Sequence, residues 1–366
     1  MNHRLLASIS ALSSLGALAV ILAVPLSSPV FGQIGQIGQT SNAAPAKSTA
    51  SSKSAPAARS KTWTVPRTPD GHPDLQGVWT NVTLTPMERP AQFKDKPTIS
   101  DAEAKAYETK DLETNNIDDP NAPLLARAGS AGTGGYNNLF IDRGSELARV
   151  DGVKRTSLIV DPPDGRTPAM LPRAPRTQGG GGQGEGYAGM SYDSVKTRPL
   201  AERCLIGFGS TSGPPMLPVL YNNNYQIVQT PDAIMILVEM VHDVRVIRMN
   251  AEHDPPALTK WLGDSVGHWE GDTLVVETVN VNPKNRFRGA SDKFRVTERF
   301  QRVDAGTILY RATIDDPGAY TKPWTVEYPF VATAGPVFEY ACHEGNYAMQ
   351  DILGGARRQD AEPKSK

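Results

Sequence analysis

The chain has 366 residues, of which 39% are hydrophobic and 21% are charged, a composition typical of globular proteins. Its 38 basic and 39 acidic residues nearly balance, but residues 1–61 contain five of the basic residues and no acidic one. The remaining 33 basic and 39 acidic residues give residues 62–366 about six net negative charges. This balance argues against a generic nucleic-acid-binding protein, because phosphate binding needs a positive surface.

The N-terminus has the pattern of a secretory signal peptide. Arg4 supplies a positive charge, residues 5–26 are apolar, and small side chains precede a possible cleavage site ahead of Gln33. The apolar stretch is about 20 residues long, so a transmembrane anchor is the alternative, although several serines dilute it. We expect a cleaved signal over residues 1–32, a periplasmic or extracellular protein, and no stable membrane span after cleavage.

Low-complexity segments flank the predicted folded part of the chain. Residues 33–61 and 357–366 contain too few apolar side chains to bury a core. We therefore expect a disordered linker over 33–61, a single β-rich domain over 62–356 and a disordered tail over 357–366. A glycine-rich stretch at 178–186 is interpreted as a surface loop of that domain.

One helix is predicted near the start of the domain. Ser100 and Glu103 have the spacing of a capping box, which marks a helix N-terminus. The helix is placed over about residues 101–113, and its many charged side chains indicate a surface position.

The second half of the chain has the pattern of successive strands separated by turn sequences. The expected strands lie at residues 225–229, 233–241, 244–249, 268–270, 273–281, 294–303, 307–314, 324–331 and 337–342. Short connections make neighbouring strands antiparallel, and the helical crossovers that parallel strands need are not visible. Segments at 76–81 and 156–160 add strands within extended, proline-rich arms. A meander of about eight strands with one apolar face must pack on a second sheet or close into a barrel, and we favour the barrel.

Five segments of the domain have distinctive sequences: PDGHPDLQGVW at 69–79, RTSLIVDPPDG at 155–165, YNNNY at 221–225, WEGDTLVV at 269–276 and YACHEGNY at 340–347. In these segments the chain resembles a family of uncharacterised exported bacterial proteins. The resemblance covers roughly residues 62–356. It implies export and a domain boundary, and it implies no particular chemistry.

A shorter motif, Gly77-Val78-Trp79, is similar to the Gly-x-Trp opening of lipocalin-like barrels. In those barrels the tryptophan packs across the barrel floor beneath a ligand cavity. With the meander, this resemblance implies a mainly β protein with an antiparallel, lipocalin-like (calycin-type) barrel, extended N-terminal arms and one short helix.

Two glutamates are predicted to point into the apolar interior. Glu298 shares a strand face with apolar neighbours, and Glu239 lies in a run that is apolar on both faces. An inward carboxylate must be paired, protonated or in contact with a ligand. An ion pair with Arg245 or Arg299 is the simpler interpretation. The alternative makes both glutamates polar anchors in a cavity, or an acid and a base in an enzyme.

Aromatic side chains would form the walls of such a cavity. The predicted ligand is a small, partly apolar molecule, and the predicted ligand-binding residues are Trp79, Glu239, Arg245, Glu298 and Tyr328.

The histidines show no pair with the local spacing of metal ligands, so we expect neither a metal nor a cofactor. His242 and Asp243 most simply form a tight turn. The alternative is an acid–base group at the mouth of the barrel, for which the candidate catalytic residues are His242, Asp243, His343 and Glu344.

Cys204 and Cys342 are the only cysteines. In an oxidising compartment they could form a disulfide, and otherwise they would be two buried thiols; the sequence leaves both possibilities open.

Three functions remain. The first is an exported small-molecule-binding protein with a lipocalin-like barrel. The second is a cofactor-independent hydrolase or lyase that uses carboxylate and histidine at the barrel mouth. The third is a cell-envelope interaction protein without a pocket.

Overall fold

The structure is a computed structural model that describes residues 63–116, 141–172, 191–207, 213–285 and 287–362. The predicted signal peptide, the linker that follows it and the glycine-rich stretch lie outside the described residues.

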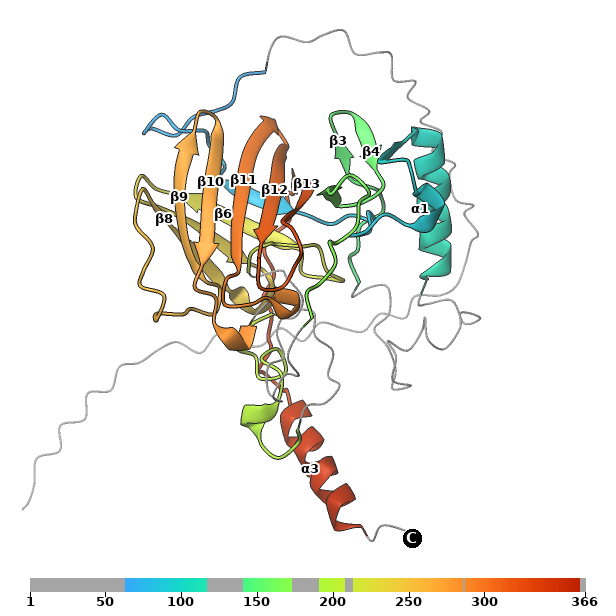
Figure 1. Ribbon diagram of the computed structural model, residues 1–366, viewed down its shortest axis with the longest axis vertical. Coiled ribbons are helices and arrows are strands. Elements are labelled where there is room, and N and C mark those ends of the chain that lie inside the picture. Colours follow the sequence, from blue (N-terminus) through green and yellow to red (C-terminus); the bar gives the residue numbers. More distant parts are fainter. Residues whose placement is uncertain (1–62, 117–140, 173–190, 208–212, 286, 363–366) are drawn as a thin grey trace, which may run out of the picture. The chain divides into compact units, whose positions relative to one another are not determined.

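Nine strands of the described chain form a closed, mixed β-barrel (Figure 1). They are β1 (Gly77–Thr80), β6 (Asn224–Gln229), β7 (Ala233–Val238), β8 (Val244–Met249), β9 (Asp264–Glu270), β10 (Thr273–Val279), β11 (Arg295–Asp304), β12 (Thr307–Asp315) and β13 (Trp324–Ala332). Neighbours pair in this order, and β1 also pairs with β13, which closes the barrel. A further strand, β5 (Ile159–Asp161), pairs with β13. The prediction of a mainly β protein with a barrel is confirmed.

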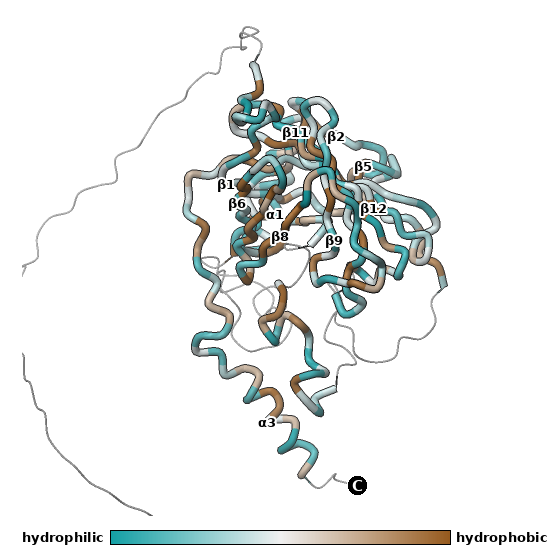
Figure 2. The backbone as a smooth tube through the Cα atoms, turned by 90° about the vertical axis from the view of Figure 1, so that its left-hand side faces the viewer, coloured by the Kyte–Doolittle hydropathy of each residue, from teal (hydrophilic) through white to brown (hydrophobic). Residues whose placement is uncertain are grey.

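Alternation along the strands places the core inside the barrel. On β11, Val296, Glu298 and Phe300 are buried, whereas the residues between them are partly exposed. Figure 2 shows both hydrophobic and hydrophilic residues along the strands. Successive strand side chains point to opposite faces, so every second residue fills the interior and the residues between them face outward.

The expected all-antiparallel order is wrong at one position. β8 and β9 are parallel, with Ile247 paired to Ser265. A parallel neighbour requires a connection long enough to return to the starting end of the strand. Residues 250–263 provide that length without a helix, which is why the pattern of the sequence did not reveal the crossover.

The last predicted strand, at 337–342, is also absent from the structure. The backbone N–H groups of Phe338 and Tyr340 donate to side chains instead, to Glu239 Oε1 at 3.0 Å and to His242 Nε2 at 2.9 Å. This segment is therefore tethered to the β7–β8 turn by two side chains rather than by a strand ladder.

A disulfide between Cys204 and Cys342, with the Cα atoms 5.8 Å apart, cross-links this tethered segment to residues 191–207. Helix α3 (Ala348–Ala361) follows, so the chain is helical over the first part of the predicted disordered tail. It buries Leu353, and burial of an apolar side chain stabilises a helix that Gly354 and Gly355 would weaken. Within the described ranges, no helix is long and apolar enough to cross a bilayer.

A second, smaller sheet lies beside the barrel. It consists of β2 (Thr98–Ile99), β4 (Val153–Arg155) and β3 (Arg149–Val150), and helix α1 (Asp101–Thr114) contacts it (Figure 1). The predicted capping box is present, because Ser100 accepts from the Glu103 N–H and Glu103 accepts from the Ser100 N–H. α1 buries only Ala104 and Glu108, as expected for a surface helix.

Candidate functional site

A buried ion pair lies in the interior of the barrel. Arg245 and Glu298 are 1% and 0% exposed, and the guanidinium donates to both carboxylate oxygens, at 3.0 and 2.6 Å. Tyr310 donates a further hydrogen bond of 2.8 Å to Glu298. Burial and the Glu298 charge raise the pKa of Tyr310 well above its usual value, so its hydroxyl remains a donor. Arg245, rather than Arg299, is thus the partner of Glu298.

A segment of the chain itself fills the space beside this pair. Residues 213–217 are all buried. The Met216 N–H donates to the Tyr310 hydroxyl at 3.1 Å, and its carbonyl accepts from Tyr328 and, at 2.9 Å, from Asn81 Nδ2. The polar groups that the sequence assigned to a ligand are thus bonded within the chain.

Two other predicted ligand-binding residues, Trp79 and Glu239, are buried and bond to other parts of the chain. Trp79 is 2% exposed, its Nε1 donates to the Leu75 carbonyl at 3.0 Å, and Arg302 lies over its ring. Glu239 is 2% exposed and accepts from Asn224 Nδ2 at 2.8 Å as well as from Phe338. Neither side chain contacts the Arg245–Glu298 pair through a hydrogen bond that the structure shows.

The four candidate catalytic residues lie near the disulfide. His242 has a left-handed φ of 54° within the tight β7–β8 turn, and its Nε2 lone pair accepts from Tyr340. Asp243 Oδ2 accepts from the Gly207 N–H at 3.4 Å, while His343 and Glu344 are exposed. Among the described residues there is no group of three or more His, Cys, Asp or Glu side chains that could hold a metal ion.

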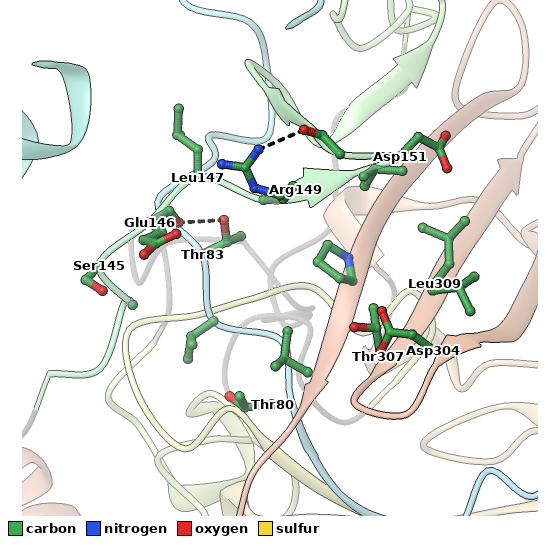
Figure 3. Close-up of a pocket in the computed structure, with 18 of the residues that line it drawn as sticks. Thr80, Thr83, Ser145, Glu146, Leu147, Arg149, Asp151, Asp304, Thr307 and Leu309 are labelled. Atoms are coloured by element: carbon green, nitrogen blue, oxygen red, sulfur yellow. Dashed lines mark hydrogen bonds between the residues drawn. The ribbon is translucent and has the colours of Figure 1, made fainter. Parts of the chain in front are cut away.

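A large cavity, lined by described residues, lies outside the barrel. It measures about 780 Å³ and lies between the outer face of β12 and β13 and residues 142–152. These residues include β3 of the small sheet and the segment that leads into it. In Figure 3 the labelled side chains approach this space from two sides, with Leu309 and Asp304 on the barrel side and Glu146 and Arg149 opposite. We call this space the outer cleft.

The outer cleft has an apolar floor and an acidic rim. Outward-facing Leu309 and Pro329 are half-buried, and Val303 and Val331 are 42% and 45% exposed. The rim carries four carboxylates and one guanidinium, from Asp142, Glu146, Asp151, Asp304 and Arg149.

The outer cleft was not predicted from the sequence, because the outward-facing residues of each strand were expected to be polar. The apolar residues Val303, Leu309 and Val331 all break that alternation on the solvent side. Such breaks are the sequence signal of a covered or binding face, but only the fold shows that they lie together.

A charged cluster around Asp264 was also missed. Its carboxylate is 1% exposed and accepts from Arg248 at 3.0 Å, from Lys260 at 2.7 Å and from the Asp254 N–H at 2.9 Å, with His253 Nδ1 also 3.0 Å away. Burial alone would raise the pKa of Asp264, but these hydrogen bonds outweigh burial and hold the pKa well below its usual range. The cluster fixes the crossover between the parallel strands.

Comparison of the chain with models of known protein families and with curated proteins finds no match.

Proposed function

We propose that this protein is an exported binding protein for a small, partly apolar molecule, and that the outer cleft is its binding site. The observation that carries the proposal is the combination of size and lining: about 780 Å³ with an apolar floor and a polar rim. Ligand pockets typically measure about 300–1,000 Å³ and combine an apolar surface with a few polar groups.

The rim indicates the charge of the ligand. Two of the four carboxylates accept from nearby backbone N–H groups, Asp142 from Gly144 at 3.3 Å and Asp304 from Gly306 at 2.8 Å. Glu146 pairs with Lys154, and the one basic rim residue, Arg149, pairs with Asp101. The excess of carboxylates favours a ligand with a positive charge or several hydrogen-bond donors.

Two features support the compartment. The N-terminal sequence has the signal-peptide pattern, and the Cys204–Cys342 disulfide fits an oxidising environment. Mass analysis of the mature N-terminus tests export, with cleavage expected close to Gln33. An intact, membrane-embedded N-terminus would contradict it.

Titration with phenethylamine, which combines an aromatic ring with an ammonium group, tests the cleft by calorimetry. Leu309→Trp places a large side chain on the cleft floor and should abolish binding. Leu237→Trp is the matched control, because Leu237 is also half-buried on the outer face of a barrel strand but does not line the cleft. Equal loss of binding in both variants, or none in either, would refute the assignment.

The rim is tested separately with Asp151→Asn and Asp304→Asn. Asparagine keeps the hydrogen-bonding shape and tolerates the positive φ of 52° at position 151. We expect each change to weaken amine binding roughly threefold through lost charge attraction, with no change in thermal stability. If a protein with both changes bound the amine as tightly as the parent, the rim carboxylates would have no role in attracting the ligand.

A further inference from the structure

The single parallel pairing among the described barrel strands leaves part of the barrel wall unpaired. The β8–β9 ladder starts at Ile247↔Ser265, so residues 244–246 have no strand partner on the β9 side. Residues 260–263 of the crossover lie across a cavity from them, and this cavity measures about 420 Å³. We call it the seam pocket.

Four large apolar side chains around the seam pocket remain exposed to solvent. Val244 and Val246 are 48% and 50% exposed, Leu205 is 40% exposed and Trp261 is 37% exposed. They come from three separate segments of the chain. Exposed apolar side chains that gather around one hollow are typical of a ligand site, whereas single ones are common on any surface.

The charged lining of the seam pocket is mainly basic, with Arg245, Arg248 and Lys260 against Asp243. Arg248 and Lys260 are held in place by Asp254 and Asp264, neither of which lines the pocket. A ligand in this space would therefore meet the cations first.

Arg245 adds a second, independent observation. Its side chain is 1% exposed and its terminal nitrogens bond to Glu298, yet its buried Nε has no hydrogen-bond partner in the part of the chain that the structure describes. Buried donors are normally satisfied, and this one belongs to a residue of the pocket wall.

From these features we propose that the seam pocket is a second binding site, which takes an organic anion: a small molecule with an aromatic or branched apolar body and a carboxylate or sulfonate group. Val244, Val246, Leu205 and Trp261 would contact the apolar body. Lys260 and Arg248 would attract the anionic group. This goes beyond the proposed function, because the site lies on different strands from the outer cleft and selects the opposite charge.

The experiment uses the fluorescent anion 8-anilinonaphthalene-1-sulfonate as the probe and its neutral parent, N-phenyl-1-naphthylamine, as the charge control. The unmodified protein should bind the sulfonate saturably and more tightly than the neutral compound. Val246→Glu places a negative charge in the pocket and should weaken sulfonate binding about tenfold, while Val246→Gln should weaken it less.

Three further variants fix the location. Leu205→Glu reaches the same pocket from another segment and should have the same effect as Val246→Glu. Val228→Glu is the matched control, a 37% exposed valine on β6 that does not line the pocket, and it should bind the probe as the parent does. Leu309→Trp, which fills the outer cleft, should also leave sulfonate binding unchanged, so the two sites are tested independently.

Thermal unfolding of each variant verifies that it is folded. The proposal is overturned if Val228→Glu weakens binding as much as Val246→Glu. It is also overturned if the neutral compound binds as tightly as the sulfonate, or if the unmodified protein shows no saturable binding.

Discussion

The inside and the outside of the barrel use charged side chains in different ways. Inside, Arg245 and Glu298 neutralise each other's charge, Tyr310 donates to Glu298, and the Tyr310 hydroxyl accepts from the N–H of Met216 in the inserted segment. Outside, the outer cleft is lined by four acidic residues against one basic residue. The seam pocket has the partly exposed cations Arg248 and Lys260 against Asp243, and only the buried Arg245 is shared with the interior pair. Interior charge therefore stabilises the fold, whereas the charge available for recognition lies on the outer wall.

The largest expected effect comes from breaking the interior pair. Glu298→Gln leaves Arg245 buried without a counter-charge and should reduce the free energy of unfolding by about 3–5 kcal/mol, measured by chemical denaturation. The control is Glu270→Gln, which removes the partner of Arg299 on the outer face, where the two side chains are 49% and 41% exposed. The control should melt like the parent, because surface ion pairs contribute little.

A Glu298→Gln protein with the stability of the parent would contradict this contrast between inside and outside. If it also bound every ligand of the parent unchanged, neither a structural nor a binding role would remain for Glu298.

The Asp264 cluster should give an intermediate effect that depends on pH. The pKa of Asp264 is lower in the folded protein than the usual value of about 3.9, so its contribution to stability is present above that value and is lost as pH falls below about 4. Asp264→Asn should therefore lower stability at neutral pH and flatten the pH dependence of unfolding between about pH 4 and 2. If the free energy of unfolding changed with pH in the same way in the variant and the parent over that range, the hydrogen bonds to Asp264 would not govern acid stability.

The smallest effect should be local and confined to the tethered segment after β13. Glu239→Gln weakens the acceptor for the Phe338 N–H and should speed amide exchange at Phe338 about tenfold with little change in global unfolding. Glu344→Gln changes an exposed glutamate farther along the same segment and should leave that exchange rate unchanged. Equal acceleration in the two variants would show that the tether does not depend on Glu239.

Local rules determined which residues form most of the strands and which helix opens the domain. The capping box at Ser100 and Glu103 depends on four consecutive residues, and the helix begins where that pattern places it. The two-residue alternation around Glu298 placed this carboxylate inside, where an ion pair with an arginine was the simpler of the interpretations left open. These features were predictable because each depends on a few neighbours in the chain.

Only the tertiary structure decided the rest, because it depends on residues that are distant in sequence. Arg299 directly follows Glu298 on β11 and faces outward, but only the strand order brings Arg245 of β8 to Glu298 in the interior. The same order makes β8 and β9 parallel, and the gap at the start of their ladder produces the seam pocket. The outer cleft arises where the small sheet faces β12 and β13, and the two cysteines meet across 138 residues. The alternation along one strand specifies which side chains face outward, but it contains no information about which distant segment covers them.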